Sequence, residues 1–136
     1  MSIFIDTSAF LALLDRDENN FPSAKTIWRD LIEEEQGLST SNYVFLETHA
    51  LIQRRLGMEF VQAFAENLVP MIEIEWIDRT IHQSGVTAML TANRRQLSLV
   101  DCISFEVCRK LGIKDVFAFD KHFEEQGFHL LSARND

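Results

Sequence analysis

Four acidic residues occupy positions from which their carboxylates could work together: Asp6, Glu47, Asp101 and Asp120. Asp6 directly follows the apolar run 3–5, and Asp120 directly follows the run 116–119. Glu47 lies one to two turns into one predicted helix, and Asp101 lies near the start of another. Ionised carboxylates that are gathered among apolar residues repel one another and are costly unless a cation or hydrogen-bond donors satisfy them. A bound divalent cation is the natural counter-charge.

The available ligand types favour a hard cation. The two cysteines and four histidines form no cluster with the spacing of a zinc site, so we expect the carboxylates to supply oxygen ligands only. Oxygen ligation favours Mg²⁺ or Mn²⁺ over zinc. One such ion, or two about 4 Å apart, would activate water and bridge phosphate oxygens. The acids therefore predict chemistry on a phosphoester.

Each acid also has a structural interpretation. Asp6 could cap the helix that follows it, and Asp120 could cap a short helix after the fourth strand. Ser98 and Asp101 have the spacing of a capping box, and Glu47 could be a solvated helix residue. At this stage the capping and catalytic interpretations both remain open.

The elements that must position these acids alternate along the chain. Strands are predicted at 3–5, 38–41, 72–76, 116–119 and 128–131, and the main helices at 21–36, 42–56, 79–93, 100–111 and 121–126. Helical segments between strands imply a mainly parallel sheet with right-handed crossovers, which gives one three-layer α/β/α domain over residues 1–136. Sites in such sheets form beyond the carboxyl ends of the strands. Asp6 and Asp120 belong at that edge, whereas Asp101 follows another helix and is not placed by this rule.

Glycines and large apolar residues give further expectations about the helices. Four glycines that follow helical segments are predicted as left-handed caps: Gly37, Gly57, Gly112 and Gly127. Gly85 interrupts the helix 79–93 and should cost it about 1 kcal/mol relative to alanine. Trp28 and Trp76 are predicted core anchors. The apolar faces of the first two helices are expected to exceed what one core can cover, with Phe10, Leu11, Leu13, Leu14, Ile27 and Leu31 on them.

Composition narrows the classes of protein that the chain could belong to. Its 136 residues are 46% hydrophobic and 25% charged, which is typical of a folded globular domain and excludes a disordered chain. The longest apolar stretches fall far short of the roughly 20 residues that a membrane-spanning helix needs. No signal peptide is readable, so we predict a cytoplasmic protein without a membrane partner. Cys102 and Cys108 are too far apart along one helix for a disulfide.

Charge argues against general affinity for nucleic acids. Thirteen Lys and Arg residues face 21 Asp and Glu residues, a formal net charge of −8. Three basic doublets could still contact phosphates, although solvated helix faces or ion pairs are an equal alternative: Arg54-Arg55, Arg94-Arg95 and Arg109-Lys110. Recognition of a nucleic acid would then depend on local patches.

Four segments in this order resemble those of one family. They are IFIDTS at residues 3–8, TSNYVFLET at 40–48, LSLVDCISF at 97–105 and VFAFDKHF at 116–123. Their combination and spacing over nearly the whole chain resemble the PIN-domain ribonucleases, specifically the toxins of bacterial VapBC-type toxin–antitoxin pairs. The sequence departs from many relatives at Ala118, where they carry Ser or Thr.

The resemblance implies a metal-dependent endoribonuclease with Asp6, Glu47, Asp101 and Asp120 as its catalytic, Mg²⁺- or Mn²⁺-binding quartet. The first three would hold an ion, and Asp120 would complete the pocket or position water. The hydroxyl of Thr7 or Ser8 would support a ligand or a water molecule. Cleavage would leave 5′-phosphate and 3′-hydroxyl ends.

The resemblance also implies partners, and two alternatives to this activity stay open. The implied partners are an RNA such as tRNA or mRNA, a cognate antitoxin and a second copy of the chain. One alternative is metal-independent attack by the ribose 2′-hydroxyl, using Lys121 and His122, although contact of these residues with phosphate or solvent is the preferred interpretation. The other is a non-catalytic PIN-fold module that binds RNA or protein, against which the intact acidic quartet argues.

Overall fold

A parallel sheet forms the centre of the protein. The computed structural model describes residues 2–133, and all five strands in it run parallel in the order β3-β2-β1-β4-β5. The strands are β1 (Ser2–Ile5), β2 (Gly37–Ser41), β3 (Glu73–Glu75), β4 (Asp115–Phe117) and β5 (His129–Leu130). Because every strand runs in the same direction, all five carboxyl ends lie at one edge. The five predicted strands are therefore confirmed, within one or two residues at their ends.

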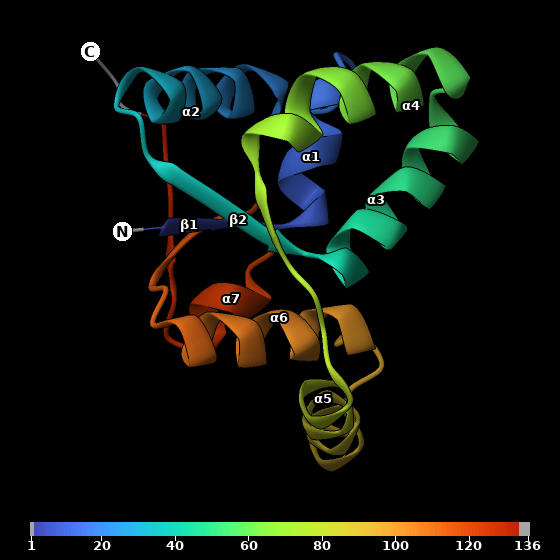
Figure 1. The fold of residues 1–136 in the computed structure, drawn as a ribbon, viewed down its shortest axis with the longest axis vertical. Helices are drawn as coiled ribbons and strands as arrows, with labels where there is room; N and C mark the ends of the chain where they lie inside the picture. Colours follow the sequence, from blue (N-terminus) through green and yellow to red (C-terminus); the bar gives the residue numbers. More distant parts are fainter. Residues whose placement is uncertain (1, 134–136) are drawn as a thin grey trace.

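Helices cover both faces of this sheet. They are α1 (Thr7–Leu14), α2 (Phe21–Glu33), α3 (Asn42–Arg55), α4 (Met58–Ala63), α5 (Arg79–Ala92), α6 (Leu99–Leu111) and α7 (His122–Glu125). After α4 the chain continues through a π-helical turn, η1 (Phe64–Leu68), and a 3₁₀ turn, η2 (Val69–Met71). Figure 1 shows α1, α2 and α4 on one side of the sheet and α5, α6 and α7 on the other, with α3 leaving the end of β2. The α/β/α architecture is confirmed.

Aromatic side chains fill the two layers between sheet and helices. On one side Phe64 packs edge to face on Phe10 and Phe45, with ring centroids 5.0 and 5.7 Å apart, and Phe10 lies tilted against Phe45 at 6.4 Å. On the other side, Phe105 and Phe123 pack edge to face at 5.0 Å. Edge-to-face pairs of this kind add about 0.5–1.5 kcal/mol beyond the area they bury. The rigid sheet that carries the acids is thus packed on both faces.

The distribution of apolar residues corrects one prediction. Phe10, Leu11, Ile27 and Leu31 of the first two helices are buried in the core. Leu13 and Leu14 are half-buried and line a pocket with Trp28 and Phe60, so apolar surface beyond the core stays a prediction. Trp76 is 72% exposed and is not a core anchor. It follows β3, which is an edge strand, so no further strand of the described sheet lies beside it. Trp28 is half-buried against the core, as predicted.

Three of the four predicted glycine caps are confirmed. Gly57, Gly112 and Gly127 have φ values of 93°, 69° and 91°. Gly37 is not a cap and instead begins β2. Glu35 takes the left-handed conformation at the end of α2, with φ 52°, because the helix ends at Glu33 and the turn closes before Gly37 is reached. Both cysteines are buried and free, as predicted.

Gly85 lies where α5 packs most closely on α6. A Cβ atom added there would stand 2.3 Å from Ile103 Cδ1 and 2.9 Å from its Cγ1, and Ile103 is fully buried. Gly85 lowers the helix propensity of α5, but its lack of a Cβ atom allows α5 and α6 to pack closely. Since α6 carries Asp101, this contact also fixes the position of one acid.

We expect Gly85→Ala to lower the free energy of unfolding by about 1 kcal/mol. Overpacking costs about 1–3 kcal/mol, and the gain in helix propensity of about 1 kcal/mol offsets part of it. Urea denaturation would measure the change, with Ser84→Ala on the exposed side of α5 as the control that stays near wild type. A stabilised Gly85→Ala protein would contradict this packing account.

Among residues 2–133, no helix has the length and apolar character needed to cross a membrane.

Candidate active site

Asp6 lies at the carboxyl end of the central strand β1. Its backbone N–H donates to Phe117 O of β4 at 3.0 Å, which ties the ends of the two neighbouring strands together. The side chain is 4% exposed and caps α1. Its Oδ2 accepts hydrogen bonds from Ser8 N at 3.1 Å and from Ser8 Oγ at 2.6 Å.

Of the two predicted supporting hydroxyls, Ser8 is the one that contacts an acid. Ser8 Oγ donates to Asp6 and accepts from Phe119 N at 3.0 Å, so it connects Asp6 to the loop that carries Asp120. Thr7 Oγ1 turns toward α3, where it accepts from Thr48 Oγ1 at 3.1 Å. Thr7 therefore fixes the start of α1 against α3.

Asp101 is brought to the same edge by the N-terminus of α6. It occupies the third helical position in a capping box, in which Ser98 N donates to Asp101 Oδ2 at 3.1 Å and Asp101 N donates to Ser98 Oγ at 3.0 Å. The residue is 8% exposed. The helix cap thus sets the position of Asp101, which the order of strands and helices alone did not predict.

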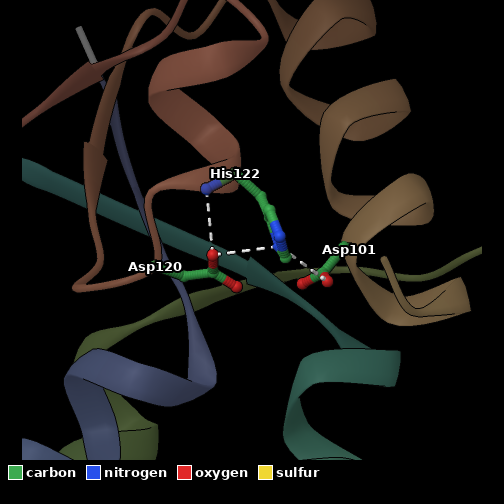
Figure 2. A group of neighbouring side chains, drawn as sticks. All are labelled: Asp101, Asp120 and His122. Atoms are coloured by element: carbon green, nitrogen blue, oxygen red, sulfur yellow. Dashed lines mark hydrogen bonds and ion pairs between the residues drawn. The ribbon is translucent and has the colours of Figure 1, made fainter. Parts of the chain in front are cut away.

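Asp120 and His122 complete this group from the loop after β4. The strand ends at Phe117, two residues earlier than predicted, and Asp120 Oδ1 accepts a hydrogen bond from His122 N at 2.9 Å. His122 Nδ1 lies 3.0 Å from Asp120 Oδ1 and 3.6 Å from Asp101 Oδ2. Figure 2 shows the ring lying between the two carboxylates.

The sequence names His122 only for metal-free cleavage and does not predict its position among the acids. Its side chain is 17% exposed and points into the acidic group rather than into open solvent, and contact with a phosphate stays a prediction. Ligand atoms of Asp101, Asp120 and His122 all lie within 4.8 Å of one another, so a nitrogen atom is available beside the predicted oxygen ligands. The available signal was local: a histidine two residues after an acid can fold back when the acid accepts its backbone N–H.

Glu47 makes no described contact with the other acids. It is half-buried on α3, and within residues 2–133 its carboxylate makes no hydrogen bond or ion pair and is not one of the atoms in the group around His122. Asp6 is also outside that group of ligand atoms, but the charges of Asp101 and Asp120 act on it. The structure therefore brings three of the four predicted acids together electrostatically.

Burial raises the pKa of two of these carboxyl groups. The pKa of Asp6 rises to about 7, mainly through burial and in smaller part through the negative charges of Asp101 and Asp120, against the lowering effect of Ser8. Burial likewise raises the pKa of Asp101, with the charge of Asp120 adding to it. Ionised carboxylates at this edge are therefore costly in the protein alone, and a cation would lower that cost.

Capping and cation binding do not exclude each other here. The caps use Oδ2 of Asp6 and Oδ2 of Asp101. Oδ1 of each residue makes no hydrogen bond within residues 2–133. The capping interpretations of Asp6 and Asp101 are confirmed, and each acid keeps one oxygen for a ligand. Asp120 is not the N-cap of α7, because that position is taken by Lys121.

The sequence matches the PIN domain over residues 3–128. This chain belongs to the PIN-domain family. It is 33% identical over 127 residues to the 23S rRNA-specific endonuclease VapC20 of Mycobacterium tuberculosis, in strains CDC 1551 and H37Rv, and the alignment covers 93% of this chain and 95% of VapC20.

Solved structures agree with this assignment. The crystal structure of M. tuberculosis VapC20, described as a sarcin-ricin loop cleaving toxin, superposes with a TM-score of 0.81 at 32% identity and covers 93% of this chain and 95% of that one. VapBC2 from Rickettsia felis, bound to promoter DNA, gives 0.71 at 10% identity, covering 96% and 98%. FitAcB from Neisseria gonorrhoeae gives 0.69 at 14% identity, covering 96% of each chain. The last two show a shared fold.

The basic doublets of this PIN domain are partly engaged in surface contacts. Arg94 pairs with Glu125 at 2.9 Å, and Lys110 pairs with Glu75 at 3.2 Å. Arg109 donates to Gln126 at 2.9 Å and lies over the Phe128 ring. Of the residues in these doublets, Arg54, Arg55 and Arg95 are exposed and have no such contact in the described structure.

We expect Asp6→Asn to stabilise the metal-free PIN domain at high pH only. The folded-state pKa of Asp6, about 7, lies above its ordinary value of 3.8, so the folded state binds the proton more tightly than the unfolded state. This carboxyl group therefore makes the free energy of unfolding fall as pH rises from about 4 to about 7. Chemical denaturation in chelator should give similar stabilities for wild type and Asp6→Asn at the lower end of this range, where both carry a neutral side chain. At pH 8.5 the variant should be the more stable protein, and equal stabilities there would contradict the raised pKa.

Proposed function

We propose that this PIN domain is a metal-dependent endoribonuclease that acts as the toxin of a toxin–antitoxin pair. The observation that carries the proposal is the convergence of Asp6, Asp101 and Asp120 from β1, α6 and the loop after β4, with free carboxylate oxygens at the carboxyl edge of a parallel sheet. The relative VapC20 is named an endonuclease and aligns over 93% of this chain. The chain's length and family match favour one PIN domain over residues 1–136.

The residues present fit a divalent cation. Ligand atoms of Asp101, Asp120 and His122 lie within 4.8 Å of one another, and burial raises the pKa of Asp6 and Asp101. His122 Nδ1 is buried and makes no hydrogen bond with any group in residues 2–133. A cation would satisfy this nitrogen and offset the carboxylate charges, and the mainly oxygen ligand set favours Mg²⁺ or Mn²⁺.

The four acids have separate tasks in this proposal. Asp6, Glu47 and Asp101 would hold the ion, and Asp120 would complete the pocket or position water. Ser8 orients Asp6 through its 2.6 Å hydrogen bond and keeps Oδ1 available. When bound, the ion lowers the pKa of water and neutralises charge on the phosphate oxygens. In-line hydrolysis at this site leaves a 5′-phosphate and a 3′-hydroxyl.

Glu47 is the acid whose role most needs a direct test. Its side chain lies on α3 at the same edge and is half-buried, so it can turn toward an ion that Asp6 and Asp101 already hold. We expect Glu47→Gln to slow RNA cleavage at least about tenfold and to weaken Mn²⁺ binding, because one ligand charge is removed. Glu59→Gln, on the exposed side of α4, is the matched control. Wild-type cleavage by Glu47→Gln would remove Glu47 from the site.

The proposed partners follow from charge and from the relatives. VapC20 is named for 23S rRNA, so ribosomal RNA is a candidate target beside tRNA and mRNA. The net charge of −8 and the buried acids would suit an antitoxin that places a basic side chain at the site. A homodimer and a cytoplasmic location are further parts of the proposal.

Incubation of the purified protein with labelled 23S rRNA, tRNA and mRNA in Mn²⁺ tests this function. Discrete RNA fragments, and no fragments from DNA of the same sequence, are the expected result. RNA binding without cleavage under any metal condition would contradict the proposal and favour a non-catalytic RNA-binding module.

A further inference from the structure

Three of the four histidines have hydrogen-bond partners for their Nδ1 atoms, and His122 does not. His49 Nδ1 lies 2.7 Å from Phe45 O, and His82 Nδ1 lies 2.6 Å from the Tyr43 hydroxyl. His129 Nδ1 lies 2.9 Å from Asp115 Oδ1. His122 Nδ1 is buried and makes no hydrogen bond within residues 2–133, although two carboxylates lie within 3.6 Å of it. A buried nitrogen without a hydrogen bond needs an explanation, because such atoms are rare.

The position of this ring is fixed from two sides. Its backbone N–H donates to Asp120 Oδ1 at 2.9 Å, which locks the loop just before α7. The next residue, Phe123, is fully buried and packs edge to face on Phe105 and against Phe4. The core thus holds α7 in place, and Figure 2 shows the imidazole directed between Asp101 and Asp120. This arrangement is preorganised for a ligand that contacts all three side chains.

We propose that His122 Nδ1 is a ligand of the divalent ion and makes the site select Mn²⁺ over Mg²⁺. The inference rests on the proposed metal site. Mg²⁺ prefers oxygen ligands in near-ideal octahedral geometry, whereas imidazole nitrogen is a ligand for transition metals. One nitrogen beside the carboxylates of Asp101 and Asp120 therefore favours Mn²⁺. Within the described residues, Nδ1 makes no hydrogen bond in the protein alone, although both carboxylates lie within 3.6 Å of it, and ligation would give it a bond.

The alternative to direct ligation is an ion pair. A protonated His122 could neutralise Asp101 and Asp120 without touching the metal, since both oxygens are within ion-pair distance of Nδ1. In that case the proton would occupy the lone pair that ligation requires. The two arrangements differ in one observable, which is a bond between nitrogen and the ion.

Electron spin echo spectroscopy of the full chain loaded with Mn²⁺ measures that bond without any assay of activity. We expect wild type to show nitrogen modulation that changes when its histidines carry ¹⁵N. We expect His122→Ala to lose this modulation and His129→Ala to keep it. His129 is the matched control because it is 70% exposed and also faces an aspartate. Bound Mn²⁺ without a histidine nitrogen signal in wild type would overturn the inference.

Metal affinities give the second readout. We expect His122→Ala to raise the Kd for Mn²⁺ at least about tenfold and the Kd for Mg²⁺ by a smaller factor. His122→Asp replaces the nitrogen by an oxygen ligand, so it should retain Mg²⁺ binding and lose the preference for Mn²⁺. If His122→Ala raises the Kd for Mn²⁺ and the Kd for Mg²⁺ by the same factor, a nitrogen ligand is contradicted.

The two proposals fail in distinguishable ways. If wild type cleaves RNA with Mn²⁺ but shows no histidine nitrogen at the ion, the function stands and the role of His122 is wrong. If wild type binds no Mn²⁺ at all, both the metal-dependent function and the ligand role of His122 are wrong.

Discussion

Asp101→Asn should abolish RNA cleavage while leaving the metal-free protein at least as stable as wild type. The loss should be about a thousandfold or more, because the ion supplies several kcal/mol of charge stabilisation and each 1.36 kcal/mol is a factor of ten in rate. Stability should not fall, because burial raises the pKa of Asp101 and its ionised form is therefore costly at neutral pH. The amide oxygen of Asn can still accept the hydrogen bond from Ser98 N.

Thermal unfolding with and without Mn²⁺ separates the two roles of Asp101. Asp101→Asn should show an unchanged or higher Tm in chelator and a smaller rise in Tm on adding Mn²⁺. Asp115→Asn, which lies at the amino end of β4 on the opposite edge, should keep both cleavage and the Mn²⁺ response. A loss of about 1 kcal/mol or more in chelator would show that capping by the charged side chain dominates.

Ser8→Ala is the second substitution for which we expect a large effect. The Ser8 hydroxyl donates to Asp6 and accepts from Phe119 N, so its removal leaves a backbone donor of the Asp120 loop without that acceptor. This should cost about 1–3 kcal/mol of stability. Asp6 also loses a hydrogen bond that lowers its pKa, so that pKa should rise above about 7. We expect cleavage at pH 7 to slow at least about tenfold and to recover in part at higher pH.

The conservative variant Ser8→Thr keeps the hydroxyl and should retain most of the activity. Thr7→Ser is the matched control, because Thr7 Oγ1 contacts Thr48 of α3 rather than an acid. Cleavage rates from pH 6 to 9 would show whether the optimum moves. If Ser8→Ala slows cleavage equally at every pH, the effect is structural and the proposed link to Asp6 fails.

The strands and their common edge could be predicted because local sequence determines them. Runs such as 3–5 and 116–119 are apolar on both faces and too short for helices, which in an alternating chain indicates a buried parallel sheet. That topology alone placed Asp6 and Asp120 at one edge. The capping box of Ser98 and Asp101 is also a local pattern, and the structure contains it.

The features that could not be predicted depend on contacts between distant segments. The direction of the His122 ring depends on how α7 packs on Phe105 and on where α6 places Asp101. The close approach at Gly85 depends on Ile103 of the next helix. Trp76 is exposed after β3, which is an edge strand, and strand order follows from the whole topology. Sequence spacing carries none of this information.

The net charge of −8 is distributed in a way that the sequence could not show. Asp6, Asp101 and Asp120 act on one another at the carboxyl edge, where a divalent ion would offset part of the charge. The basic residues with described partners lie on the outer surface, as Arg94 and Lys110 do. We therefore expect weak general affinity for RNA and a strong dependence of cleavage on the ion.

The chemistry of the RNA ends tests metal-dependent hydrolysis most directly. The protein would be incubated with an end-labelled RNA in Mn²⁺, in EDTA and in EDTA followed by excess Mn²⁺, and the ends of the fragments would be identified. We predict 5′-phosphate and 3′-hydroxyl ends in Mn²⁺, no cleavage in EDTA, and recovery when Mn²⁺ is restored. Cleavage that persists in EDTA and leaves 2′,3′-cyclic phosphate would contradict the account, because it would require the ribose 2′-hydroxyl as nucleophile and no metal.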